Sequence, residues 1–107
     1  MTVHDTYGMS AHTTAELARI TADRLGLTFA ERESDYRGTY YCAEAGPYQI
    51  EVQPNAIPGD DGQDDLYAPD HPKAQTLVLV TGSHRAPALD VGLNGIDTLQ
   101  LLEQETS

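Results

Sequence analysis

Apolar side chains recur at helical spacing in the first third of the chain. Leu17, Ile20 and Leu25 fall on one side of a helix, with alanines between them. Thr13 precedes this run and a glutamate follows three positions later, which is the pattern of a capping box. Gly26 can adopt the left-handed conformation that ends many helices. The pattern therefore predicts a helix over residues 13–25.

Residues 1–12 show no such regularity. Neither the helical nor the two-residue period is visible in this segment. We therefore expect residues 1–12 to form a flexible N-terminal arm.

A different period follows the helix. Residues 27–33 begin to alternate, residues 39–44 are rich in tyrosine and threonine, and residues 48–53 alternate cleanly. A Gly-Pro break at 45–47 between the second and third runs is typical of a hairpin. In the third run one face would carry Tyr48, Ile50 and Val52, and the other Gln49, Glu51 and Gln53.

Residues 54–74 break the pattern and are expected to form a long acidic, proline-rich loop. Four of the six prolines and five aspartates lie there. A structureless loop of this length is uncommon inside a compact domain and is often functional or disordered.

The remainder of the chain predicts a strand, a helix and a strand. Residues 76–80 form a short apolar run typical of a central strand. Leu89, Leu93 and Ile96 recur at the spacing of a short helix, and residues 98–103 close the domain as a strand. Residues 105–107 are expected to be a polar tail.

These elements predict a single α+β domain over residues 13–104. The order favours a two-layer sandwich, with an antiparallel or mixed sheet of about five strands and one or two helices on one face. The ferredoxin-like arrangement is the nearest named alternative, but its element order differs.

The distribution of charge predicts the character of the surface and leaves the predicted fold unchanged. The net charge is −11, of which residues 1–37 carry −2 and residues 38–107 carry −9. Such a field repels nucleic acid and anionic membranes and favours basic partners or cations.

No apolar run approaches the roughly 18 residues of a membrane span. The first residues lack the features of a secretory signal, so we expect a cytoplasmic protein.

A two-layer domain leaves one sheet face uncovered. If Ile50 and Val52 lie under the helices, the other face holds Tyr40, Cys42, one alternate pair from 77–80, and Leu102. Two interpretations stay open. This face is an association surface, or the loop 54–74 folds across it and buries it.

The polar residues suggest several kinds of chemistry, none with a complete motif. The acidic loop from Asp60 lacks the glycine and glutamate positions of an EF-hand, although clustered carboxylates can bind a divalent ion weakly. The single cysteine, Cys42, excludes an internal disulfide, and its acidic surroundings favour packing over a nucleophilic role. An anion-binding turn at 82–85 lacks a phosphate-loop motif. We expect no catalytic residues, no metal and no cofactor.

Part of the chain resembles a group of proteins. Residues 51–55, the acidic Asp-Gly loop, Leu77–Val80 and Leu99–Leu102 look similar to small acidic actinobacterial proteins of unknown function. The likeness covers about residues 27–104 and rests on strand and loop patterns. It implies no activity and no catalytic residues.

The sequence favours a non-enzymatic module that binds a basic protein, as immunity proteins, antitoxins and nucleic-acid mimics do. The expected partner-binding residues are Tyr40, Glu44, Glu51, Asp60, Asp61, Asp64, Asp65 and Tyr67. The alternative is a small enzyme or a ligand- or metal-binding protein with a pocket between loop 54–74 and the sheet, where Tyr67, Asp70, His71 and His84 would act. A homodimer through the open sheet face is a third possibility.

Overall fold

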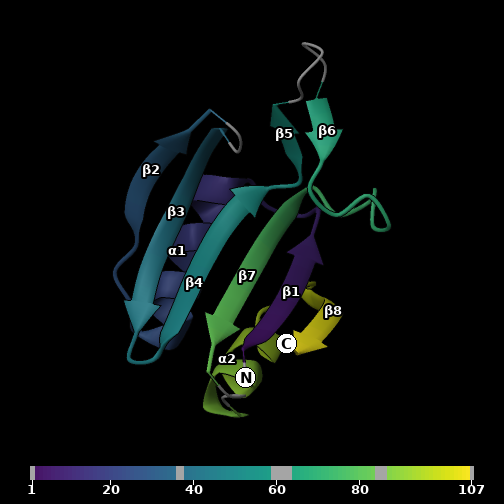
Figure 1. Ribbon diagram of the computed structural model, residues 1–107. Helices are drawn as coiled ribbons and strands as arrows, with labels where there is room; N and C mark the ends of the chain where they lie inside the picture. Colours follow the sequence, from purple (N-terminus) through teal and green to yellow (C-terminus); the bar gives the residue numbers. More distant parts are fainter. Residues whose placement is uncertain (1, 36–37, 59–63, 84–86, 107) are drawn as a thin grey trace.

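The computed structural model describes residues 2–35, 38–58, 64–83 and 87–106. It is an α+β fold built on a six-stranded antiparallel sheet, with a second sheet of two strands. Figure 1 shows α1 lying across one side of the large sheet, while the small hairpin projects from its end. The order of strands in the large sheet is β2-β3-β4-β7-β1-β8. The elements are β1 (Val3–Met9), α1 (Thr14–Leu25), β2 (Ala30–Ser34), β3 (Gly38–Ala45), β4 (Tyr48–Pro54), β5 (Ala56–Pro58), β6 (Asp64–Leu66), β7 (Thr76–Gly82), α2 (Pro87–Asn94) and β8 (Gln100–Thr106).

The helix α1 begins and ends as the sequence predicts. The Thr13 hydroxyl accepts from the Glu16 backbone N–H at 3.2 Å, and the Glu16 carboxylate accepts from the Thr13 backbone N–H at 3.0 Å. The hydrogen bond from the Thr13 backbone N–H lowers the pKa of Glu16, and the Thr13 side chain lowers it further. Gly26 ends the helix with φ 67°, in the left-handed region that glycine adopts without steric cost. The predicted helix 13–25 is confirmed.

The main core lies between α1 and the sheet. It contains Leu17 of α1, Ile50 and Val52 of β4, and Val78 of β7, all of them buried. Leu93 of α2 belongs to the same cluster, and α2 contacts α1. The predicted phase of β4 is therefore correct, because Ile50 and Val52 face the core.

The prediction of a flexible N-terminal arm is wrong. Residues 3–9 form β1, an inner strand of the sheet that pairs with β7 on one side and β8 on the other. Tyr7 is only 1% exposed and Val3 and Met9 are buried. The alternation is hidden in the sequence because Asp5 occupies an inward position and Gly8 an outward one. The space beside Gly8 is already filled, since a Cβ there would lie 2.6 Å from Leu102 Cδ1.

Three other boundaries also differ from the sequence prediction. The strand expected at 27–33 is β2, and it begins only at Ala30. The last strand runs to Thr106, so most of the expected tail 105–107 pairs with β1. The expected loop 54–74 is not structureless, because it contains the β5–β6 hairpin and a hydrogen-bonded segment described below.

We predict that Tyr7→Ala lowers the free energy of unfolding by about 3–5 kcal/mol, since it removes a fully buried aromatic ring from an inner strand. The measurement is equilibrium denaturation in urea. His4→Ala on the same strand is the control, because this exposed side chain should cost less than about 0.5 kcal/mol. Equal stability of the two variants would show that β1 is not part of the core.

Candidate functional site

The sheet face opposite α1 carries several of the predicted binding residues. Cys42 of β3 pairs with Glu51 of β4, and Glu44 pairs with Gln49. Tyr40 stands two positions before Cys42 and therefore on the same face. We call this side of the sheet the open face. The predicted placement of Tyr40, Glu44 and Glu51 together is confirmed by the register.

The far edge strand adds two further carboxylates. In β8, Glu103 pairs with Thr6 and Glu105 with His4, so both lie on the open face. Arg32 of β2 pairs with Tyr40 and stands at the opposite edge of the same face. The described glutamates therefore outnumber the arginine on this surface.

The centre of the open face is covered. Leu77 is 0% exposed, and it packs with Leu79, Ala68 and the half-buried Ala74 and Leu102. Ala68 and Ala74 belong to residues 67–75, which we call the crossing segment. The interpretation that loop 54–74 buries this face is thus correct for the leucines of β7, whereas Tyr40 and Cys42 remain half-buried.

A single buried asparagine fixes the crossing segment. Asn55 is 1% exposed, and its Nδ2 donates to the backbone carbonyls of Ala74 at 2.7 Å and His71 at 3.1 Å. Its Oδ1 accepts from the Ala68 backbone N–H at 2.8 Å. Backbone hydrogen bonds also join Asn55 to Tyr67 and Gln75. The segment is therefore held at both of its ends by one residue, which lies between β4 and β5.

Tyr67 begins the crossing segment and lies beside the acidic part of the open face. A recess of about 230 Å³ is lined by Tyr67 together with His4, Thr6, Glu51, Leu79 and Thr81. The Tyr67 side chain is a large apolar group that stays 46% exposed. The structure thus brings Tyr67 next to Glu51, as an aromatic residue beside a carboxylate.

The acidic stretch that begins at Asp60 lies largely outside the described residues. Asp60 and Asp61 lie outside them, and so does His84. Asp64 belongs to β6, and Asp65 on the same strand is exposed. The β5–β6 hairpin projects away from the sheet, so Asp65 is not brought together with Glu44 and Glu51 (Figure 1). Within the part of the chain that is described, no group of three or more His, Cys, Asp or Glu side chains could hold a metal ion.

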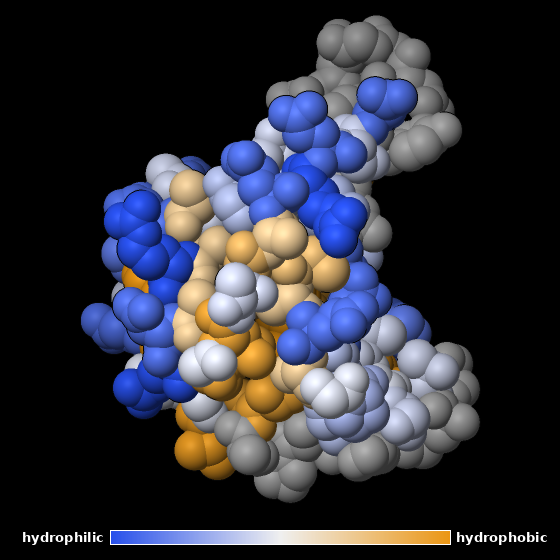
Figure 2. Space-filling model, turned by 90° about the vertical axis from the view of Figure 1, so that its left-hand side faces the viewer, coloured by the Kyte–Doolittle hydropathy of each residue, from blue (hydrophilic) through white to orange (hydrophobic). Residues whose placement is uncertain are grey.

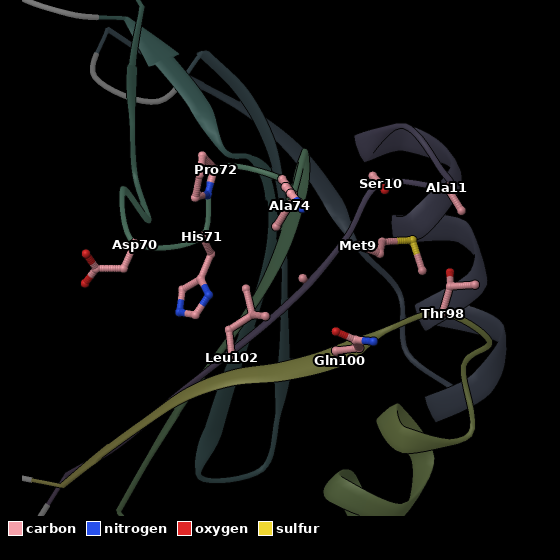
Figure 3. Close-up of a pocket in the computed structure, with 12 residues that line it drawn as sticks. Met9, Ser10, Ala11, Asp70, His71, Pro72, Ala74, Thr98, Gln100 and Leu102 are labelled. Atoms are coloured by element: carbon pink, nitrogen blue, oxygen red, sulfur yellow. The ribbon is translucent and has the colours of Figure 1, made fainter.

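A pocket of about 660 Å³ lies at the other end of the crossing segment. Its walls are the end of β1 with residues 10–11, residues 70–74, and Thr98 together with Gln100 and Leu102 at the start of β8. Figure 3 shows His71 and Leu102 on one side, with Met9, Thr98 and Gln100 on the other. The His71 Nε2 lies 3.7 Å from Glu103 Oε1. The alternative hypothesis of a pocket between loop 54–74 and the sheet thus has a physical counterpart, which includes Asp70 and His71 but not Tyr67.

Cys42 takes part in no acid–base arrangement among the described residues. Its Sγ lies 3.3 Å from Gln49 Nε2, which donates to it. On the helix side of the same strand, Tyr41 donates to Glu31 Oε1 at 3.3 Å. Loss of hydration raises the pKa of Tyr41, and the charge of Glu31 raises it further. These contacts fix the orientations of the Cys42 and Tyr41 side chains.

Figure 2 shows a second surface feature, an apolar area on the side of the molecule where β2 and α1 lie, with hydrophilic side chains around it. A groove of about 370 Å³ in this region is lined by apolar and small residues, together with Arg19 and Thr28. The apolar and small ones are Ala15, Ala18, Ala22, Leu27, Phe29 and Tyr41. This groove is distinct from the open face.

Sequence reasoning missed Asn55, Gly8, Thr98, Glu103 and Glu105. Thr98 has φ 66°, which is unusual for a β-branched residue and costs about 1–3 kcal/mol. No local sequence pattern predicts these roles, because each depends on a neighbour that is distant in the sequence. Only the Pro-Asn pair at 54–55, a common turn signal, could have drawn attention to Asn55.

Comparison of the chain with known protein families and with curated proteins finds no match. The resemblance to small acidic actinobacterial proteins therefore stays a prediction. None of the helices among the described residues is long and apolar enough to cross a membrane.

We predict that Asn55→Ala lowers the free energy of unfolding by about 3 kcal/mol, because it leaves the Ala68 N–H without its buried acceptor. Hydrogen exchange should also accelerate at the Ala68 and Tyr67 amides before it does in β7. Asn94→Ala, at an exposed position at the end of α2, is the control and should change neither quantity appreciably. Unchanged exchange at Ala68 would contradict the assigned role of Asn55.

We also predict that Thr98→Gly raises the free energy of unfolding by about 1 kcal/mol, because glycine adopts a positive φ without the steric cost that threonine has. Thermal and urea denaturation measure this change. Thr28→Gly, at an exposed loop position with no positive φ, should instead destabilise the protein. Destabilisation by both variants would show that Thr98 carries no local strain.

Proposed function

We propose that the protein is a non-enzymatic module that binds a basic protein through the acidic part of its open face. The observation that carries this proposal is the convergence of Tyr40, Glu44 and Glu51 on one face, with Tyr67 beside Glu51. Glu103 and Glu105 extend the same surface at its far edge. The predicted cytoplasmic location belongs to the same proposal.

Charge and aromatic groups have different tasks in such an interface. The glutamates steer a cationic partner and raise the association rate, and this effect weakens with added salt. The half-buried Tyr40 and the exposed Tyr67 are rigid amphipathic side chains of the kind that dominate binding energy. We therefore expect salt to act on association and the tyrosines to act on dissociation.

The same surface favours a basic partner over the other candidates. Phosphate backbones and anionic headgroups are repelled by a net charge of −11. A second copy of this chain would bring Glu44 and Glu51 against glutamates of the same face, and like charges in an interface are unfavourable. A partner of opposite charge thus fits better than a homodimer.

The test begins with capture of cross-linked proteins at low ionic strength and their identification by mass spectrometry. Each captured protein is then purified and its binding rates are measured. We predict that Glu44→Gln with Glu51→Gln weakens binding about tenfold, mainly through slower association, and reduces its salt dependence. Tyr67→Ala should accelerate dissociation about tenfold.

The control variant, Asp23→Asn with Glu33→Gln, removes the same charge from exposed positions outside this surface. It should leave the dissociation rate unchanged and slow association only slightly. If the control weakens binding as much as the open-face variant, the open face is not the interface. Partners that are neutral or acidic and bind independently of salt would refute the proposed function.

A further inference from the structure

The 660 Å³ pocket has walls that are fixed before any ligand arrives. Asn55 holds the wall at 71–74 through the carbonyls of His71 and Ala74. On the opposite side, the Thr76 hydroxyl donates to the His12 carbonyl at 2.9 Å, and the Gln75 N–H donates to the Met9 carbonyl at 2.9 Å. A preformed cavity of several hundred Å³ is typical of small-molecule sites.

The floor of the pocket is apolar and closely packed. A Cβ at Gly8 would lie 2.6 Å from Leu102 Cδ1 and 2.9 Å from Ala74 Cβ. Only glycine therefore leaves Leu102 and Ala74 in their present places on the pocket wall. Together with Met9 they present hydrocarbon to the cavity.

Polar groups stand at the rim. Thr98 and Gln100 supply a hydroxyl and an amide on the side opposite His71 (Figure 3). The backbone of Thr98 has a positive φ at this position. Backbone strain that persists beside a cavity is a frequent mark of a binding site. The lining thus combines a hydrocarbon floor with hydrogen-bonding groups at its edge.

Among the described charged residues at the rim, Lys73 is the group that attracts an anion at short range. The Asp70 carboxylate points away from the pocket in Figure 3, and the Glu103 carboxylate lies against His71. Lys73 lines the pocket and forms no ion pair with any residue that the structure describes. It is one of only two lysine or arginine residues in the acidic part of the chain, the other being Arg85.

We propose that this pocket binds a small amphipathic carboxylate. Its hydrocarbon part lies on Gly8, Ala74 and Leu102, and its carboxylate pairs with the Lys73 ammonium. The net charge of the protein opposes this only weakly, because at physiological salt exposed charges beyond about 8 Å are largely screened. This site lies across the crossing segment from Glu44 and Glu51 and uses neither of them, so the proposal does not rest on the proposed function.

The experiment uses hexanoate as the probe, with hexanamide and hexylamine as ligands of similar size and different charge. Binding to the full chain is followed by methyl NMR of Leu102, Ala74 and Met9. We expect hexanoate to shift these resonances and to bind about tenfold more tightly than hexanamide. Tighter binding of hexylamine, or the absence of pocket shifts with hexanoate, would overturn the proposal.

The variant Lys73→Gln provides the second measurement. Because Lys73 is exposed, we expect this variant to fold like the parent, and thermal denaturation of the two proteins checks this. This variant should reduce hexanoate affinity to that of hexanamide and leave hexanamide affinity unchanged. Arg19→Gln removes the same charge from α1 and should leave both affinities as they are. Hexanoate affinity that is equal in Lys73→Gln and the parent would refute the pairing of the carboxylate with Lys73.

Discussion

The buried amide of Asn55 is the interaction on which both candidate sites depend. One side chain satisfies two carbonyls and one N–H of the crossing segment, so that backbone without regular structure can lie against leucines. The Nδ2 bond to His71 places that residue at the pocket, and the backbone carbonyl of Asn55 accepts from the Tyr67 N–H and places Tyr67 beside the 230 Å³ recess. Without this amide, the polar backbone over Leu77 would lack partners, and burying it would be unfavourable.

The crossing segment divides the open face into two parts with different chemistry. Beyond its covered centre, β3 and β4 present Tyr40, Glu44 and Glu51. Toward β8, the segment and the strand enclose a pocket, and Lys73 is the one lysine or arginine among the described residues that line it. A strongly acidic chain can therefore have both a surface for a basic protein and a site for a small anion. Salt screens the field of the distant carboxylates, so that Lys73 acts on the anion at short range.

Much of the fold follows from local sequence, and the parts that do not are those fixed by distant contacts. The capping box at Thr13 and the alternation at 48–53 are complete within a few residues, so α1 and the phase of β4 could be predicted. In β1 the two-residue period is interrupted by a buried Asp5 and by Gly8, whose missing side chain makes room for Leu102 on β8. Local sequence patterns do not indicate the contact between Gly8 and Leu102.

The candidate site shows the same division. Tyr40, Glu44 and Glu51 could be placed on one face from strand alternation alone. The contribution of β8 could not, since Glu103 and Glu105 reach this face only because β8 pairs with β1. The proline and aspartate content of 54–74 predicts a loop, but composition reveals neither the β5–β6 hairpin nor the ordering of the crossing segment by Asn55.

The pocket exists because small residues cover the open face. A second layer of helices would fill the space above Leu77 and Leu102 with large side chains, whereas the crossing segment contributes Ala68 and Ala74. Leaving a cavity beside packed leucines has a cost in stability that grows with its volume. Larger side chains at these positions would reduce this cost. Gly8 is explained by the close packing of Leu102 and Ala74 against it. The alanines and the strained Thr98 at the rim are better explained by a requirement for the space than by stability.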